Sequence, residues 1–310
     1  MMWGAVSRKA VILGAGGFLG INLAHALAAL RIETLVFDRV FCDHWPSSAR
    51  VMIGDIAAPP EALRAQMEGA VVFHLAGTAR PSISTDRIGA EIASDIAMGV
   101  ALLEWSRDCP CRWVFASSGG TVYGEASTPR IDESHPTDPM SSYGIAKLTM
   151  EKYFNLYGRL YGIDYVIARI ANPFGPFQQP NTGQGLIATL FGRVRRGEVI
   201  DIWGDGENVR DYLYIDDMID ALVRLAGCGA SARIYNVGSG TGTSITQLIT
   251  HIAQIAGRAP VLRHYPARTI DVRRNVLDVE RLKRDTAWTQ KIPLHEGLRR
   301  TGLWFDDRSM

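Results

Sequence analysis

Tyr143 and Lys147 are the residues whose types and spacing point most directly to chemistry. They stand four positions apart in the segment YGIAK, residues 143–147, and on a helix this spacing puts both side chains on one face. A lysine ammonium beside a tyrosine hydroxyl favours the phenolate and lowers the pKa of the tyrosine. Such a pair forms a base that takes a proton from a hydroxyl group near neutral pH. The same two residues also occur by chance on helix surfaces, so a second signal is needed.

A glycine-rich loop near the N-terminus supplies that signal. An apolar run at 11–13 leads into GAGGFLG, residues 14–20, whose glycines have the spacing GxxGxxG. The first glycine allows a tight strand-to-helix turn, the second lets the backbone approach a pyrophosphate, and the third permits close helix–strand packing. The helix N-terminus adds N–H groups and a positive dipole end. We expect this loop to bind a dinucleotide cofactor through Gly14, Gly17, Phe18, Leu19 and Gly20.

The end of the second expected strand bears on the choice of cofactor. Asp38 is placed to accept hydrogen bonds from both ribose hydroxyls of NAD, and it would repel a 2′-phosphate. Arg39 follows it and would suit NADP, so we favour NAD and keep NADP as the alternative. Asp55 and Ile56 follow a further expected strand that ends before Gly54, where an adenine amino group needs an acceptor. A loop aspartate that caps a helix is equally expected at Asp55.

Short apolar runs alternate with amphipathic stretches in the first half of the chain. The pattern predicts strands at 10–13, 34–37, 71–75, 113–116 and 165–170, and helices at 18–30, 92–105 and about 142–161. This alternation indicates an α/β fold with a doubly wound parallel (Rossmann) sheet. Beyond Pro173, glycine and proline become frequent, which predicts a smaller, mixed α/β C-terminal domain. We expect a dinucleotide-binding domain at 1–171, to which about 208–238 returns through elements at 212–219 and 234–237, and a substrate domain at 172–310.

The bulk composition excludes several functional classes. The chain has 310 residues, a formal net charge of +1 and 21% charged residues, so nothing suggests a nucleic-acid partner. The cysteines Cys109 and Cys111 are too close for a common zinc spacing, and no metal site is expected. We expect all four cysteines to be reduced thiols of a cytoplasmic protein. No apolar run reaches the length of a membrane span.

These motifs together resemble the extended short-chain dehydrogenase/reductases, specifically the NAD-dependent sugar-nucleotide epimerases and dehydratases, and most closely those like UDP-glucose 4-epimerase. The resemblance covers nearly the whole chain. It rests on the following segments: GAGGFLG at 14–20, HLAG at 74–77, SSGGTVYG at 117–124, YGIAK at 143–147, RIANPFGP at 169–176, GDG at 204–206, RDY at 210–212 and the tail at 278–298.

The resemblance implies roles for further residues. Leu75, Ala76 and Gly77 should line the cofactor, and Pro173 should lie beside the nicotinamide. Arg210 and Arg268 match arginines that bind the substrate pyrophosphate, a contact that suits the guanidinium group. The other implied substrate contacts are Asn172 near the phosphates, Asp271 on the nucleoside ribose, Ile202 and Trp203 as walls for the uracil, Leu186 in the substrate pocket, and Asn275 as a gatekeeper at the sugar C2 substituent.

The chain departs from the family pattern at two positions. Gly119 stands where the epimerases usually carry a Ser or Thr that hydrogen-bonds the reacting sugar oxygen. Ser118 or Thr121 would replace that hydroxyl, and Thr121 is the first choice because it and Tyr123 lie on one side of an extended segment. Asp95 stands where an Asn is usual on the central helix, and a carboxylate near the nicotinamide needs a partner.

The two residues that follow Gly119 narrow the choice of reaction. Dehydratase and decarboxylase relatives carry acids at the positions of Gly120 and Thr121, and neither residue acts as a general acid at neutral pH. We therefore expect 4-epimerisation of a UDP-hexose by transient oxidation at C4, with the N-acetyl forms admitted if Asn275 leaves room. The alternatives are an NAD(P)H-dependent 4-ketoreductase and, less favoured, a dinucleotide-sensing binding protein.

Relatives of this kind usually dimerise through two long helices. Here these would be about 88–107 and 142–161, whose outer faces we expect to carry Leu102, Leu148 and Phe154. The sequence alone does not separate the apolar residues of an interface from those of a core.

Overall fold

The computed structural model describes residues 8–77, 89, 92–180, 185–229, 232–268 and 271–307. The following elements make up the nucleotide-binding part: β1 (Lys9–Leu13), α1 (Phe18–Ala29), β2 (Glu33–Asp38), β3 (Arg50–Ile53), α2 (Glu61–Met67), β4 (Val71–His74), η3 (Ile92–Ala97), α4 (Met98–Ser106), β5 (Arg112–Ser118), α5 (Ser142–Tyr161), β6 (Asp164–Ile170), α7 (Ile215–Ala226) and β10 (Ile234–Val237). The strands and helices expected in the first half of the chain are all present within a few residues of their predicted ends.

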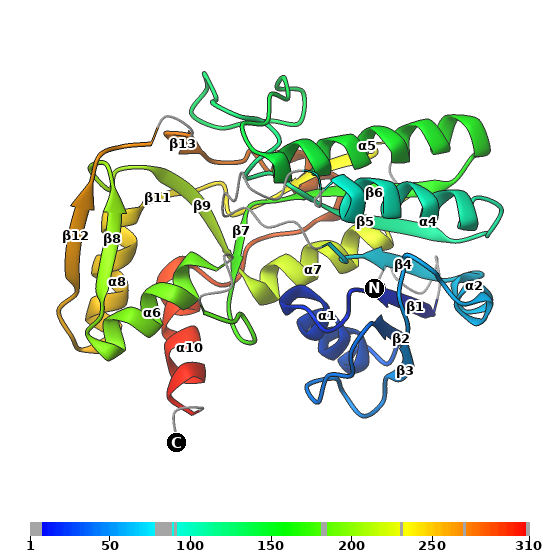
Figure 1. Ribbon diagram of the computed structural model, residues 1–310, viewed down its shortest axis with the longest axis horizontal. Coiled ribbons are helices and arrows are strands. Elements are labelled where there is room, and N and C mark those ends of the chain that lie inside the picture. The colour runs from blue at the N-terminus through cyan, green and yellow to red at the C-terminus, as the bar shows by residue number, and fades with distance from the viewer. Residues whose placement is uncertain are drawn as a thin grey trace.

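A seven-stranded sheet forms the larger part of the molecule. Its order is β10-β6-β5-β4-β1-β2-β3, and every neighbouring pair is parallel. A parallel sheet is buried on both faces, which is why β1 and β4 read as continuous apolar runs rather than as alternating ones. Figure 1 shows α1 and α7 on one face of this sheet and α4 and α5 on the other. The expected doubly wound α/β fold is confirmed.

A smaller region follows, seen at the left of Figure 1. A four-stranded sheet places β11, β9 and β13 in that order with β7 paired to β9, and β8 pairs with β12 in a separate ribbon. Its elements are β7 (Asn172–Phe174), α6 (Leu186–Arg196), β8 (Val199–Trp203), β9 (Val209–Tyr214), β11 (Gly242–Ser244), α8 (Ile245–Ala256), β12 (Val261–Tyr265), β13 (Arg274–Asn275), α9 (Glu280–Thr286) and α10 (Leu294–Asp306).

The return of the chain to the main sheet was predicted only in part. The segment 234–237 forms β10, and Ile234 to Val237 pair with Ile167 to Ile170 of β6 as expected. The segment 212–219 does not add a strand to that sheet. Its first residues belong to β9, whose neighbours β7, β11 and β13 are all in the smaller sheet, and its remaining residues begin α7.

A buried ion pair joins α5 to two strands of the main sheet. The Arg169 guanidinium of β6 donates to both carboxylate oxygens of Glu151, with Nη2 2.6 Å from Oε2. Ser117 of β5 donates its hydroxyl to the same carboxylate. The side chains of Arg169 and Glu151 are only 3% and 2% exposed, so each charge depends on the other for solvation. Glu151 lies one helical turn beyond Lys147 and therefore holds this face of α5 against the sheet.

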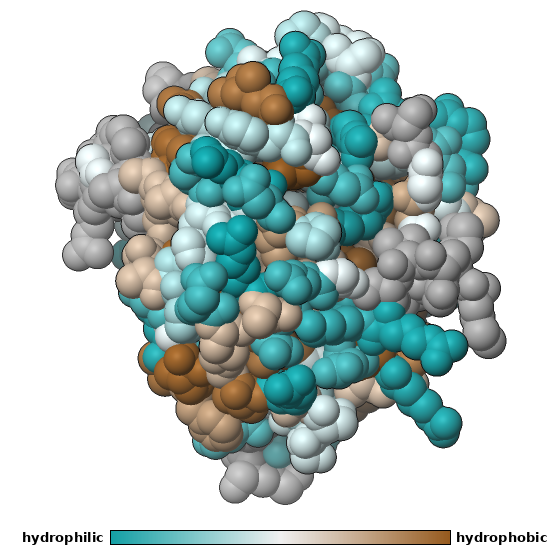
Figure 2. Space-filling view, turned by 90° about the vertical axis from the view of Figure 1, so that its right-hand side faces the viewer, coloured by the Kyte–Doolittle hydropathy of each residue, from teal (hydrophilic) through white to brown (hydrophobic). Residues whose placement is uncertain are grey.

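Figure 2 shows the side of the molecule at the right of Figure 1, where α2 lies. Hydrophobic residues there form small groups separated by hydrophilic ones. Among the described residues, no helix combines the length and the apolar character needed to cross a lipid bilayer.

Loss of the Glu151 carboxylate is expected to destabilise the fold strongly. Glu151→Ala leaves the Arg169 charge buried without its partner, and such changes lower the free energy of unfolding by about 3–5 kcal/mol. The matched control is Glu280→Ala, which removes an exposed ion pair with Lys283 and should have little effect. Urea denaturation of both variants measures the difference, and equal stability of the two would contradict a stabilising role for the buried pair.

Candidate active site

The largest concentration of predicted site residues lies at the carboxyl ends of the parallel strands. A cavity of about 750 Å³ opens there between the main sheet and the smaller region, the position where open α/β sheets bind their ligands. Seventeen of the predicted residues line it: Gly14, Gly17, Phe18, Leu19, Gly20, Leu75, Gly77, Ser118, Thr121, Tyr143, Lys147, Asn172, Pro173, Leu186, Arg210, Arg268 and Asp271. The fold thus brings together residues that are up to 257 positions apart in the chain, Gly14 and Asp271.

The glycine loop has the geometry of a phosphate cradle. Gly14 has φ +82°, and a Cβ added there would lie 2.6 Å from backbone atoms of Ala76. A Cβ on Gly20 would lie 2.6 Å from the Gly14 carbonyl oxygen. Larger residues are therefore excluded at both positions, and the backbone at the start of α1 is left open for a ligand. These residues fit the pyrophosphate of NAD, with Ala76 acting as part of the wall behind Gly14.

The residues expected at the adenosine end lie outside the cavity lining. Asp38 accepts a hydrogen bond from Gly16 N through Oδ2 (2.8 Å) and from Arg39 N through Oδ1 (2.7 Å). Its carboxylate therefore ends β2 directly behind the glycine loop, and the Arg39 side chain is exposed. Asp55 accepts from Ala57 N (2.9 Å) within its own loop and does not cap α2, whose N-cap is Pro60. Ile56 is buried.

The catalytic pair projects from the first two turns of α5. Ser141 caps this helix by accepting from Gly144 N (3.1 Å), which fixes where the helix begins. Lys147 Nζ donates to the Ala116 carbonyl oxygen (3.1 Å) and lies 5.7 Å from the centre of the Tyr143 ring. Ser118 lies next to Tyr143, and the interaction of its hydroxyl with the phenol lowers the pKa of the tyrosine. The expected grouping of Tyr143, Lys147 and a helper hydroxyl is therefore present, with Ser118 in contact with the tyrosine.

The electrostatics of the pair differ from the sequence-based expectation. Burial raises the pKa of Tyr143 to about 12, the Ser118 hydrogen bond opposes that rise, and the negative charge of Asp95 adds to it. Burial also lowers the pKa of Lys147, and Asp95 counteracts it. Burial is the largest effect on the pKa of Tyr143, and its direction is opposite to the lowering by Lys147 that the sequence predicts.

Asp95 lies close enough to Tyr143 and Lys147 for its charge to raise the pKa of both. A Cβ built on Gly77 would lie 3.2 Å from Asp95 Oδ2 and 3.7 Å from Lys147 Nζ, so the two charged groups face the same point above Gly77. His74, at the end of β4, is buried beside them, and burial with the charge of Lys147 lowers its pKa to about 3. His74 is therefore neutral, and Asp95 is the negative charge that faces Lys147. Lys147 is thus the positively charged neighbour of the carboxylate that stands in place of the usual Asn.

Close packing around Gly119 excludes a side chain at this position. A Cβ there would lie 2.5 Å from Leu277 Cδ1 and 2.9 Å from the Arg169 carbonyl oxygen, so a Ser or Thr does not fit without movement. Thr121 lines the cavity, but its Oγ1 is buried and has no hydrogen-bond partner among the described residues. Space is left at Gly120, where an added Cβ has only contacts of 3.9 Å.

Asn275 does not occupy the place expected of a gatekeeper. It is 1% exposed, donates from Nδ2 to the Gly119 carbonyl oxygen (3.0 Å) and is not among the residues that line the cavity. The strand pairing of β13 with β9 carries it behind the active-site turn. Asn275 therefore supports the turn at Gly119 from the rear, and the argument that it makes room for an N-acetyl group fails.

Arg210 and Asn172 line the cavity from the neighbouring strands β9 and β7. Asn172 donates to the Asp211 carbonyl oxygen (2.9 Å), which joins β7 to β9. Burial lowers the pKa of Arg210, and the nearby charges of Tyr212 and Asp271 oppose that change. A partly desolvated guanidinium beside a cavity is suited to bind an anionic group.

Arg268 is held by an aromatic stack. Its guanidinium carbon lies 3.6 Å from the centre of the Trp203 ring, and Trp203 stacks on Tyr265 at 5.5 Å and 19°. Trp203 does not line the cavity, and Ile202 is buried at 3% exposure. The expectation that both residues wall a base directly is not met. Trp203 instead orients the arginine that reaches the cavity.

The sequence did not indicate two polar residues of the cavity. Tyr212 Oη and Gln178 Oε1 are buried, belong to cavity-lining residues and have no hydrogen-bond partner among the described residues. With Thr121 Oγ1 they form a set of polar atoms that suits a hydroxyl-rich ligand. Tyr212 stands in the RDY segment, which was the signal available for it, whereas Gln178 had none.

The chain is similar to known proteins over most of its length. Residues 10–238 match the model of the NAD dependent epimerase/dehydratase family. The chain is 31% identical to a UDP-glucose 4-epimerase of Mycolicibacterium smegmatis, over 97% of this chain and 99% of the relative. It is similar to the solved UDP-glucose 4-epimerase of Thermotoga maritima with UDP-glucose, with a TM-score of 0.89, 31% identity and coverage of 97% and 100%. It is also similar to that of Thermus thermophilus with NAD, with a TM-score of 0.89, 30% identity and coverage of 96% and 99%.

Removal of the Asp95 charge is expected to change the pH dependence of turnover. The carboxylate raises the pKa of Tyr143, so Asp95→Asn lowers that pKa, and the phenolate forms at lower pH. The rising limb of the pH–rate profile should therefore move to lower pH. Asp108→Asn, which changes an exposed carboxylate at the other end of the sheet, is the matched control. A profile that stays in place, or moves to higher pH, argues against the influence of Asp95 on Tyr143.

Proposed function

The chain belongs to the NAD-dependent epimerase/dehydratase family, and we propose that within it the protein is a 4-epimerase that interconverts UDP-glucose and UDP-galactose. One observation carries the proposal. Tyr143 and Ser118 face the cavity together, while Gly120 and Thr121 occupy the positions at which dehydratases and decarboxylases carry acids. A site with one base and no acid at these two positions supports reversible oxidation of a sugar carbon rather than loss of a group.

The cofactor is NAD, and when bound it supplies a reversible acceptor for the hydride of the sugar carbon. Gly14, Gly17 and Gly20 would hold its pyrophosphate at the N-terminus of α1. Asp38 would accept from the ribose hydroxyls at the end of β2. Leu75, Gly77 and Pro173 line the cavity between this loop and Tyr143 and would border the nicotinamide.

Tyr143 would move the proton of the reaction. Its hydroxyl lies next to that of Ser118, so a proton taken from the sugar C4 hydroxyl can pass directly to Tyr143 or through Ser118. Lys147 supplies positive charge on the same helix face, and Asp95 keeps that lysine protonated against burial. We assign Ser118 the helper role first, because it contacts Tyr143, and Thr121 a contact to a second sugar hydroxyl through its unpaired Oγ1.

Epimerisation requires the oxidised sugar to turn while the rest of the substrate stays bound. Arg210 and Arg268 would grip the diphosphate, Asn172 would contact it, and Asp271 would bind the nucleoside ribose. Binding energy from these remote groups permits loose contacts at the sugar itself. Leu186, at the start of α6, and Tyr212 would border the sugar. The relatives named above, one of them solved with UDP-glucose, support the choice of a UDP-hexose.

The test is turnover by the purified protein without added cofactor. A 4-epimerase retains NAD and converts UDP-glucose to UDP-galactose, which chromatography separates. Tyr143→Phe should lower the rate by about 10²–10⁴-fold, as expected for loss of a general base, and should keep the bound NAD. Tyr153→Phe alters a half-buried tyrosine farther along α5 and should leave the rate near that of the unchanged protein.

Two outcomes would contradict the proposal. Consumption of NADH or NADPH in proportion to product would indicate the 4-ketoreductase instead. Failure to convert any member of a panel of UDP-, dTDP- and GDP-hexoses, including the N-acetyl forms, would leave only a dinucleotide-binding protein.

We propose further that two copies of the chain associate through α4 and α5. Leu102 and Phe154, which the sequence predicts at this interface, are fully buried in the core of the subunit and are not available to a partner. Leu156 and Leu160 of α5 are 44% and 62% exposed. The first residues of the expected helix, from Ile88, lie largely outside the described part of the chain. Leu156→Glu together with Leu160→Glu should convert a dimer to a monomer in analytical ultracentrifugation, and Leu303→Glu on α10 should not. A monomer before any substitution would contradict this association.

A further inference from the structure

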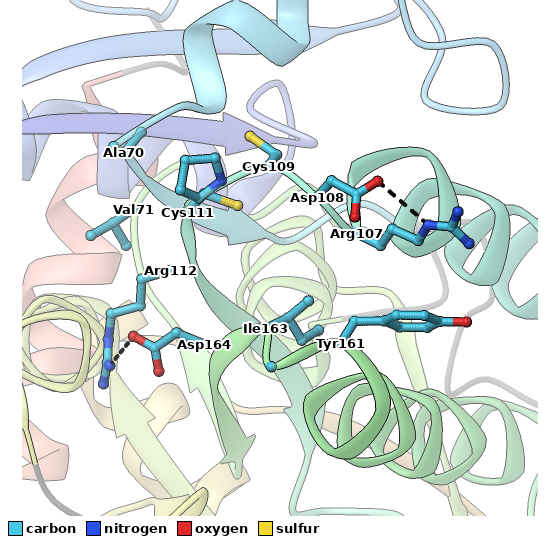
Figure 3. Close-up of a pocket in the computed structure, with 13 residues that line it drawn as sticks. Ala70, Val71, Arg107, Asp108, Cys109, Cys111, Arg112, Tyr161, Ile163 and Asp164 are labelled. Carbon is cyan, nitrogen blue, oxygen red and sulfur yellow. Dashed lines mark hydrogen bonds and ion pairs between the residues drawn. The ribbon is translucent and has the colours of Figure 1, made fainter.

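A second hollow lies at the amino ends of the main-sheet strands, where β4, β5 and β6 begin. Its volume is about 560 Å³, and its wall includes the segment Cys109-Pro110-Cys111 that joins α4 to β5. Figure 3 shows the side chains of Cys109 and Cys111 at this wall, between Ala70, which precedes β4, and the side chain of Asp108. Nothing in the proposed reaction uses these thiols, since the active site is at the other end of the strands.

Backbone hydrogen bonds fix the turn that carries the two cysteines. Cys111 N donates to the Cys109 carbonyl oxygen (2.8 Å), and Cys109 N donates to Ser106 O (2.9 Å). Gly69 N donates to Pro110 O (2.8 Å), which ties the turn to the start of β4. An i to i+2 hydrogen bond folds three residues into a tight turn, and the proline restricts its central φ. The turn therefore brings the two Cα atoms toward each other, as a disulfide requires.

The two thiols already interact. The Cys109 thiol donates to the Arg64 carbonyl oxygen (3.8 Å), and its interaction with the Cys111 thiol lowers the pKa of Cys109 and raises that of Cys111. The positive charges of Arg64 and Lys9 lower the pKa of Cys109 further, against the effects of burial and Glu68. Cys109 is therefore the better nucleophile and Cys111 the protonated partner next to it, which is the division of roles found in redox-active dithiols.

We propose that Cys109 and Cys111 form a redox-active dithiol that a small hydroperoxide oxidises to a disulfide within the Cys-Pro-Cys turn. The hollow gives a small oxidant access to a pair whose first member is only 7% exposed. The proposal is independent of the epimerase reaction, because it concerns a different cavity and different residues.

The step balances in atoms and electrons. The Cys109 thiolate attacks the terminal oxygen of the hydroperoxide, an S–O bond forms, the O–O bond breaks, and the alkoxide or hydroxide that leaves is protonated. Cys111 then attacks the sulfenic sulfur, the S–S bond forms, the S–O bond breaks, and the departing hydroxide takes the Cys111 proton to give water. Two thiols and one hydroperoxide thus yield one disulfide, one alcohol or water molecule, and one water molecule.

The disulfide should be easy to reduce. Closing a loop of three residues removes little entropy from the unfolded chain, so the bond gains little stability from folding. Disulfides of this labile kind are reduced readily by small thiols. The pair would therefore cycle between the two states instead of acting as a permanent cross-link.

Mass spectrometry of the native protein tests the proposal. Arg107 and Arg112 flank the pair, so trypsin releases residues 108–112, DCPCR, as one peptide that holds both cysteines and neither of the others. After brief treatment with stoichiometric hydrogen peroxide and blocking of the remaining thiols by alkylation, this peptide should be unalkylated and lighter by two hydrogen atoms. Dithiothreitol should restore the doubly alkylated form.

Single substitutions distinguish the roles of the two thiols. In Cys111→Ser, Cys109 should stop at the sulfenic acid, which dimedone traps. In Cys109→Ser, Cys111 should stay unmodified under the same treatment. Cys42→Ser, at a half-buried cysteine in another loop, should leave the disulfide yield unchanged. The proposal is overturned if DCPCR keeps both thiols while Cys42 is oxidised, or if Cys111 reacts equally well without Cys109.

Discussion

The buried ion pair of Glu151 and Arg169 sets the geometry of the active site. Neither charge reaches solvent, so the pair persists only if α5, β5 and β6 meet in one orientation. That orientation fixes the rotation of α5 about its axis. Lys147 lies one turn before Glu151 and is thereby directed at the end of β5, where it donates to Ala116. Tyr143 lies one turn earlier again and reaches Ser118 at the same strand end. The catalytic residues are therefore positioned by an interaction in which they take no part.

Burial at this site has two opposite effects. Burial removes water from around Tyr143 and raises its pKa, which favours the protonated phenol. Burial also lowers the pKa of Lys147, which disfavours the charged ammonium. Asp95 shifts the balance, because its charge keeps Lys147 protonated while holding the proton on Tyr143. His74 completes the group as a neutral ring. The pKa of Tyr143 thus depends on its burial, on Ser118 and on Asp95.

The smaller region shapes the active site from behind as well as from the substrate side. Leu277 fills the space in which a side chain at position 119 would lie, and Asn275 binds the Gly119 carbonyl oxygen. Asp211 accepts from Ser239, Gly240 and Leu277, which locks β9 to this segment. On the substrate side, the Trp203–Tyr265 stack supports Arg268. The packing of the two regions leaves no room for a hydroxyl-bearing side chain at position 119, and Ser118 is the neighbouring hydroxyl that lies next to Tyr143.

The sequence by itself determined the parallel sheet, the glycine cradle, the helix that carries Tyr143 and Lys147, and the family. These features depend on local order: apolar runs, glycine spacing and an i, i+4 pair follow from backbone geometry and need no distant partner. Only the tertiary structure decided the environment of Tyr143, the burial of Asn275 and Leu102, the Trp203–Arg268 contact and the assignment of β9 to the smaller sheet. The physical reason is that burial, pKa and side-chain stacking depend on residues that are far apart in the chain. Arg169 and Glu151 both stand in the printed sequence, but their pairing exists only once β6 and α5 lie side by side.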